Sequence, residues 1–407
     1  MDESPKRQAV TVKDVQPPIV CRNMIAAKKF CGSVILFIGP WLGFSAEPSF
    51  SQWKNGPPTH PNYFPIAVWV QDPKNAERYK AAGINLYVAL WRGPTTNQLA
   101  ALAKAGMPVI CSQNARGLEH KDNPIIVGWM HGDEPDNAQS LGRGKGYGPP
   151  ISPETIVRNY EKMRAADPTR PVFLNLGQGV AWDNYIGRGV RRNHPEDYPE
   201  YLKGCDIASF DIYPVVHDNP EVAGKLEFVA KGVERLRQWT RGEKLIWNCI
   251  ECTRIDNPDK KATPKQVRSE VWMSLIHGSR GLIYFVHQFK PTQREAALLD
   301  DPEMLGAISA INRQIHALAP VLNSPSVSDA IKVEAPIASM VKRHKGATYL
   351  FAVCMRNESA RATFKFRAGP NAAVAEVLEE SRKVPIQNAE FTDSFAPYEA
   401  HLYRIAD

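Results

Sequence analysis

The sequence predicts an α/β protein, a (β/α)₈ TIM barrel followed by a small antiparallel β-sandwich. Between residues 64 and 289, short apolar runs rich in β-branched and aromatic residues alternate with helical patterns, which is typical of a parallel sheet. The usual length of such a barrel is about 250 residues, which also favours this architecture. Beyond residue 320, apolar and polar residues alternate between turns, as they do in a sandwich.

Eight apolar runs are the candidate barrel strands: 64–70, 84–90, 107–113, 125–134, 170–177, 206–215, 244–252 and 281–289. A helix is expected to begin at Ser152, because Glu154 and apolar residues at helical spacing follow it. Further helices are expected at 222–241, 263–280 and 303–319. An open doubly wound sheet is the rival architecture, but no G-x-G-x-x-G motif follows the first strand.

The chain is expected to divide into residues 1–46, an N-terminal extension with a signal peptide, 47–320, the barrel, and 321–407, the sandwich. Lys28 and Lys29 precede the apolar run "FCGSVILFIGPWLGF", and small residues follow it, which is the pattern of a secretory signal. The run is short for a membrane span. We therefore expect a secreted or periplasmic protein without a stable membrane span, translated from Met24; an uncleaved anchor is the alternative.

Charge and cysteine content exclude several function classes. Residues 1–46 hold six basic and three acidic side chains, so their removal reduces the formal charge from +7 to +4, which does not indicate nucleic-acid binding. Cys249 and Cys252 have C-x-x-C spacing, but on one strand they would point to opposite faces. We expect buried thiols, no metal site and no cofactor. The sequence does not specify the oligomeric state.

Polar and aromatic residues gather where the predicted strands end, and the active site of a barrel lies at the carboxyl ends of its strands. Aromatic rings stack on sugar faces, while amides and carboxylates hydrogen-bond sugar hydroxyls, so the sequence predicts a carbohydrate ligand. The candidate binding residues are Trp69, Trp91, Arg92, Asp133, Asn175, Trp182, Asp211, Tyr213 and His287. Asp211 would be a buried carboxylate, with Arg92 or His287 as its expected partner.

Two glutamates are the candidate catalytic residues. Glu134 ends the fourth run and Glu251 lies in the seventh, so they are expected to face each other across the barrel mouth. Retaining glycosidases place two carboxyls about 5–5.5 Å apart, one as acid/base and one as nucleophile.

Three short motifs resemble those of the clan A glycosidases: "GWMHGDEP", "FDIYP" and "LIWNCIE". The resemblance covers residues 60–407 as architecture and implies a retaining glycoside hydrolase that cleaves O-glycosidic bonds of a poly- or oligosaccharide. It also implies that Glu134 is the acid/base, that Glu251 is the nucleophile, and that Tyr213 contacts the nucleophile.

One position departs from that clan. Asp133 stands where the clan usually has Asn, and the Asp133-Glu134 pair is similar to that of the β-N-acetylgalactosaminidases. Such enzymes use the 2-acetamido group of the substrate in place of an enzymatic nucleophile. A substrate-assisted β-N-acetylhexosaminidase is therefore the alternative, and a non-catalytic carbohydrate-binding barrel is a third possibility.

Overall fold

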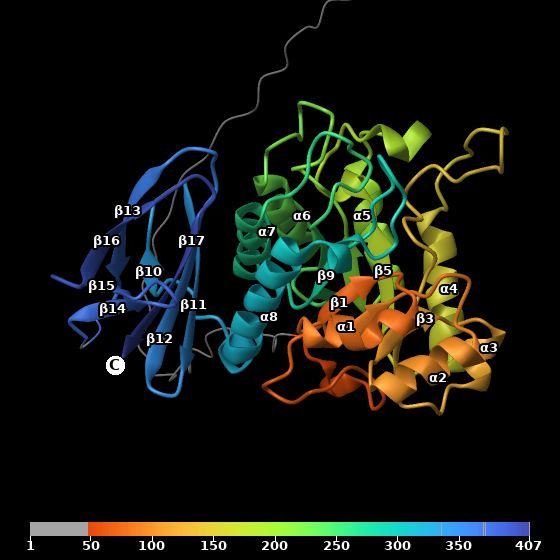
Figure 1. The fold of residues 1–407 in the computed structure, drawn as a ribbon, viewed down its shortest axis with the longest axis horizontal. Helices are drawn as coiled ribbons and strands as arrows, with labels where there is room; N and C mark the ends of the chain where they lie inside the picture. The colour runs from red at the N-terminus through yellow and green to blue at the C-terminus, as the bar shows by residue number, and fades with distance from the viewer. Residues whose placement is uncertain (1–47, 335, 369, 371, 407) are drawn as a thin grey trace, which may run out of the picture. The chain divides into compact units, whose positions relative to one another are not determined.

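A computed structural model describes residues 48–334, 336–368, 370 and 372–406 of the chain (Figure 1). The expected signal peptide, within 1–46, lies outside the described residues. Within them, no helix is both long enough and apolar enough to cross a membrane.

Parallel strands form a closed barrel in which β7 and β8 are one strand interrupted at Trp247. The strands are β1 (Ile66–Trp69), β2 (Leu86–Val88), β3 (Val109–Ser112), β4 (Ile126–Met130), β5 (Val172–Leu176), β6 (Ile207–Phe210), β7 (Leu245–Ile246), β8 (Asn248–Glu251) and β9 (Leu282–Phe285). Because β7 pairs with β6, β8 with β9, and β1 with both β2 and β9, the sheet closes on itself. The predicted barrel of eight strand positions is confirmed.

The barrel interior is a packed core. Alternate residues of each strand point inward, as the two-residue period of a strand requires. Trp247 is fully buried there, and its ring lies 5.8 Å from that of Phe173. Cys249 belongs to this inner cluster, whereas Cys252 belongs to the outer core between sheet and helices. The two thiols therefore point to opposite sides and are free.

Helices surround the barrel. They are α1 (Ala76–Ala81), α2 (Thr96–Ala105), α3 (Ala115–Glu119), α4 (Pro153–Ala166), α5 (Tyr198–Tyr201), α6 (Glu227–Trp239), α7 (Pro264–His277) and α8 (Pro302–Leu322). Short 3-10 helices lie at Phe50–Gln52, Pro73–Asn75, Gln178–Val180, Ile186–Arg191, Pro195–Asp197, Leu202–Gly204 and Ala297–Asp300. As predicted, Ser152 begins α4: its side chain accepts from the Thr155 N–H, and a proline at the first position needs no partner.

The C-terminal strands form two antiparallel sheets, which confirms the predicted sandwich architecture (Figure 1). The three-stranded sheet has the order β10 (Ile331–Lys332), β13 (Ala360–Phe366), β16 (Glu390–Phe395). The five-stranded sheet has the order β11 (Ile337–His344), β12 (Ala347–Cys354), β17 (Ala400–Ala406), β14 (Val374–Val377), β15 (Arg382–Pro385).

Helix α7 joins the five-stranded sheet to the barrel, because it contacts β11, β12 and β17 as well as β8. Trp272 of α7 stacks on Phe351 of β12 with ring centroids 5.3 Å apart, and both side chains are fully buried. Arg268 of α7 donates a 2.8 Å hydrogen bond to the Ala400 carbonyl. The side of α7 that carries Trp272 is therefore covered by the sandwich.

From this contact we predict that the barrel is insoluble without the sandwich. Because α8 continues to Leu322, a cut after Asn323 tests this better than a cut at residue 320. The 47–323 fragment should aggregate, and Trp272→Ala in the full chain should lower the free energy of unfolding by about 3–5 kcal/mol. Soluble yield and urea denaturation measure both effects. A soluble fragment with a cooperative melt would contradict the prediction.

Candidate active site

Glu134 lies in a strained turn at the carboxyl end of β4. The strand ends at Met130, earlier than the sequence predicted, and Glu134 has a φ of 41°, in the left-handed region. Its N–H donates to the Asn175 carbonyl (3.2 Å), and its own carbonyl accepts from the Asn137 N–H (3.1 Å). A non-glycine residue keeps such a backbone conformation when its surroundings fix it, and these positions concentrate at functional sites.

The Glu134 side chain meets the carboxyl of Asp211, which follows β6. Burial raises the pKa of Glu134 well above its usual range, and the charges of Asp211 and Asp133 raise it further. Burial, followed by the charge of Asp133, raises the pKa of Asp211 to about 7. The two carboxyls lie within hydrogen-bonding reach of each other, so near neutral pH the pair holds a proton and Glu134 is its preferred site.

Asp133 is more exposed to solvent than Glu134 and Asp211. Its side chain reaches solvent, but surrounding protein atoms still raise its pKa to about 6, chiefly by desolvation. Asn175, on β5, donates a 3.0 Å hydrogen bond to one Asp133 oxygen and so fixes the orientation of the carboxylate. A β-carbon added at Gly132 would meet no atom within 4 Å, so the space beside Asp133 is open.

Tyr213 and Cys249 are buried residues near the carboxyls of Asp211 and Glu134. The Tyr213 ring is 5.1 Å from that of Phe285, and burial raises the pKa of its hydroxyl, with the charge of Asp211 as the next cause. Burial likewise raises the pKa of the Cys249 thiol well above its usual range, so it is a neutral thiol. Tyr213 therefore lies beside Asp211.

The Glu251 carboxylate lies under the loop after β6, where it accepts hydrogen bonds from the N–H groups of Val215 (2.7 Å) and Val216 (3.0 Å). It is fully buried and within hydrogen-bonding reach of Glu270 on α7. The sequence led us to expect Glu251 opposite Glu134 from its position in the seventh run, and that arrangement stays a prediction. Glu251 is the last residue of β8, and here the neighbouring loop decides where the side chain lies.

The neighbour of Asp211 is neither of the two partners that the sequence predicted, Arg92 and His287. Arg92 is exposed, and its guanidinium lies 5.8 Å from the Trp91 ring centroid. The His287 ring is within hydrogen-bonding distance of the Trp69 carbonyl (3.1 Å). Asp211 instead meets Glu134 and Tyr213, so another carboxyl, not a cation, is its neighbour.

The three tryptophans predicted to bind sugar lie in different environments. Trp69 is 5% exposed and belongs to the inner barrel core. Trp182 is buried, and its indole N–H donates to Glu221 (2.6 Å). Trp91 is 70% exposed and follows β2 at the rim. Of the three, Trp91 alone is accessible enough to stack on a ligand.

Sequence reasoning missed Tyr185, which lies on the long segment 178–204 after β5. Burial raises the pKa of its hydroxyl, and the charges of Glu134 and Asp211 raise it further, so Tyr185 lies within electrostatic range of the carboxyl pair. Arg188 anchors the segment: it donates to the Asp136 carbonyl (3.3 Å) and to the Asp197 carboxylate (2.7 Å). Asp136 directly follows the motif "GWMHGDEP", but nothing in the sequence indicated which loop it would hold.

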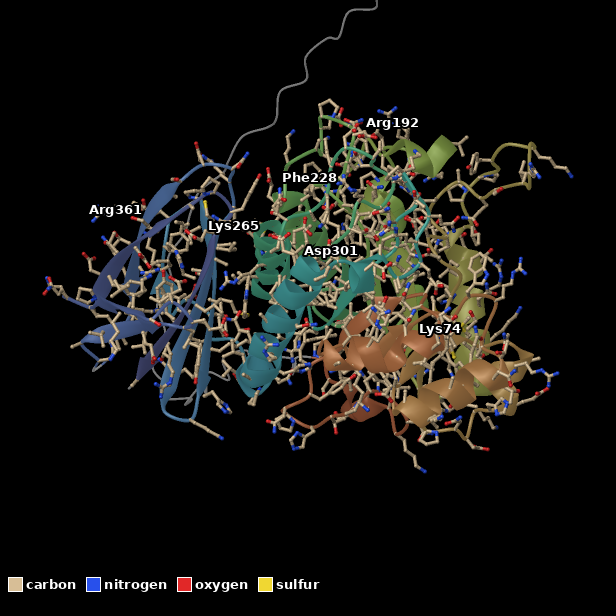
Figure 2. The ribbon with its side chains drawn as sticks, in the orientation of Figure 1. Lys74, Arg192, Phe228, Lys265, Asp301 and Arg361 are labelled. Carbon is tan, nitrogen blue, oxygen red and sulfur yellow. The ribbon has the colours of Figure 1, made fainter. Side chains whose placement is uncertain are left out.

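Exposed apolar side chains concentrate on the loops at this end of the barrel. Six that are at least 45% exposed follow β2, β4, β5 and β9: Trp91, Leu141, Tyr147, Ile186, Val190 and Phe289. Arg192 projects from the same rim (Figure 2). Among the described residues, no group of three His, Cys, Asp or Glu side chains is arranged to hold a metal ion.

No family model matches the chain, and no curated protein matches it. Among solved structures, Gan42B, a GH42 β-galactosidase from G. stearothermophilus, aligns with a TM-score of 0.55 and 8% identity over 85% of this chain and 98% of that chain. AmyP in complex with maltotriose aligns with a TM-score of 0.52 and 10% identity over 85% of this chain and 97% of that chain. At these identities the likeness shows a shared fold, that of barrel glycosidases.

Proposed function

We propose that this protein is a glycoside hydrolase with Glu134 as its general acid. The observation that carries the proposal is a carboxyl at the barrel mouth that meets the carboxyl of Asp211 and is held in a strained turn. Burial and two aspartates raise the Glu134 pKa, and a strained backbone fixes the residue. A general acid needs a raised pKa, because it must transfer a proton to the leaving glycosidic oxygen. The barrel shared with Gan42B supports the proposal.

Two mechanisms remain from the sequence, and they differ in the group that attacks the anomeric carbon. In double displacement with Glu251 as nucleophile, that carboxylate must present a free oxygen to the sugar. Glu251 is fully buried, and both of its oxygens accept backbone hydrogen bonds. Asp133 is accessible and oriented by Asn175. These contacts favour the substrate-assisted route.

In that route, the carbonyl oxygen of a 2-acetamido group attacks the anomeric carbon while Asp133 accepts a hydrogen bond from the amide N–H. The bond to the leaving oxygen breaks, and that oxygen takes the Glu134 proton. Water then opens the cyclic oxazolinium ion and gives its proton back to Glu134. The configuration is retained, and no protein ester forms.

Inhibition and labelling distinguish the two routes. With an aryl 2-acetamido-2-deoxy glycoside, Asp133→Asn should lower kcat by about 10²-fold or more, since it removes one charge that stabilises the transition state. A thiazoline analogue should inhibit, and a 2-deoxy-2-fluoro glycoside should leave no adduct. Asp256→Asn, at an exposed aspartate paired with Lys290, is the matched control. An adduct on Glu251 would restore double displacement, and sugar binding without turnover would indicate a non-catalytic barrel.

Export is the remaining part of the proposal. It rests on the basic, apolar and small-residue pattern of residues 28–46. N-terminal sequencing of protein recovered outside the cytoplasm should give a start near residue 46, and a start upstream of Met24 would contradict it.

A further inference from the structure

We infer that Glu251 is a positioning residue, which holds the loop at 214–218 in place with Glu270 as its proton-sharing partner. We call residues 214–218 the β6 loop. The inference rests on the proposed function, because the β6 loop directly follows Asp211 and Tyr213. It assigns to Glu251 a role other than attack on the substrate.

Two hydrogen bonds join Glu251 to the β6 loop. The Glu251 carboxylate accepts two consecutive backbone N–H groups, of Val215 at 2.7 Å and of Val216 at 3.0 Å. Glu251 is fully buried, and both valines are below 10% exposed. Hydrogen bonds to an ionised acceptor are stronger than neutral ones, and a buried N–H that loses its acceptor is costly. The carboxylate therefore fixes the backbone of the β6 loop.

The two carboxyls of Glu251 and Glu270 together hold a proton. Glu270 on α7 is also fully buried and lies within hydrogen-bonding reach of Glu251. Two adjacent buried carboxyls cannot both ionise without a large cost. Burial, and then the charge of Glu251, raises the Glu270 pKa well above its usual range. Burial also raises the Glu251 pKa, to about 7, while the N–H groups of Val215 and Val216 favour its charged form. Glu270 is therefore the preferred site of the proton that the pair holds.

The β6 loop is also held by the segment after β8. Asn257 donates to the Val216 carbonyl and to the Asp218 carboxylate, at 2.8 Å each. Lys260 donates to the His217 carbonyl at 2.9 Å. Together with Glu251, these residues form hydrogen bonds with every residue of the β6 loop from Val215 to Asp218.

The β6 loop also contacts the wall of the candidate site. The His217 ring is 2.9 Å from the Gln178 side-chain oxygen and meets the Trp182 ring edge to face at 5.3 Å. Both partners belong to the segment 178–204, which carries Tyr185. Release of the loop would therefore displace Tyr213 on one side and that segment on the other, without removing any group that touches the substrate.

The test compares Glu251→Ala, Glu251→Gln and Glu270→Gln with Glu303→Gln, at an exposed glutamate of α8. Hydrogen–deuterium exchange of peptides covering 211–220 is the first readout, and it needs no substrate. Glu251→Ala should speed exchange there by at least tenfold while peptides of the sandwich stay unchanged. Glu270→Gln should behave like the parent chain, because its amide N–H replaces the donated proton. If Glu251→Ala does not fold, Glu251→Gln, which accepts only one N–H, should show the same local increase.

Kinetics give the second readout. Glu251→Ala should raise KM several-fold and lower kcat by no more than about tenfold, whereas loss of a nucleophile lowers kcat by several orders of magnitude. Unchanged exchange at 211–220, or a kcat collapse that azide rescues, would overturn the inference. If Glu134→Gln keeps full activity, the proposed function fails, while the exchange result still decides the role of Glu251.

Discussion

Glu134→Gln should lower kcat on glycosides with poor leaving groups by about 10²–10⁴-fold, the usual contribution of a general acid. Activated aryl glycosides should lose far less, because their leaving group departs without a proton. Gln keeps the size of the side chain and can still hydrogen-bond to Asp211, so binding should change little. Steady-state kinetics on both substrate types measure the difference.

The same variant should alter the pH profile. Because the Glu134 pKa is raised, the acid keeps its proton at neutral pH, and kcat/KM should fall only as the pH rises through that raised value. On the acidic side, protonation of Asp133, whose pKa is about 6, should lower the rate as the pH falls. Glu134→Gln should remove the alkaline limb and keep the acidic one. Equal losses on both substrate types with an unchanged profile would exclude Glu134 as the acid.

The second large effect concerns stability. Arg188→Ala should lower the free energy of unfolding by about 3–5 kcal/mol, the usual cost of breaking a buried ion pair from one side. Arg188 is 1% exposed, bonds Asp197 and the Asp136 carbonyl, and lies over the Tyr198 ring at 4.7 Å. Without it, the buried Asp136 carboxyl loses a nearby positive charge. Urea denaturation measures the loss.

Arg192→Ala is the matched control, because Arg192 is an exposed arginine of the same segment. It should change stability by less than about 0.5 kcal/mol. Arg188→Ala should also reduce activity, because the segment that carries Tyr185 is anchored through Arg188. A similar stability for the two variants would show that the segment is held by other contacts.

The barrel was predictable because its strands are buried on both faces and read as continuous apolar runs separated by helices. The position of Asp133 and Glu134 at the rim followed from the end of one such run. The contact between Glu134 and Asp211 did not, because β5 separates β4 from β6 and a sequence does not give the distance across a barrel mouth.

Sequence patterns are less informative where regular structure ends. Cys249 and Cys252 point to opposite sides, as strand alternation predicts, but at Glu251 the strand stops and the β6 loop supplies the hydrogen bonds. Trp69 looked like a rim residue, yet it is packed in the barrel interior. Tyr185 lies in a long irregular segment whose path depends on the buried Arg188, and no periodic pattern reveals such an anchor.

The closure of the barrel has a consequence for how the chain reaches its native state. The first strand pairs with the last, with Ile66 of β1 opposite Leu282 of β9, so one edge of β1 stays unpaired until most of the chain has been synthesised. Contacts between residues so distant in sequence slow folding, and an unpaired apolar strand edge favours aggregation. We therefore expect slow folding during translation, with β1 as the segment that most needs protection by chaperones.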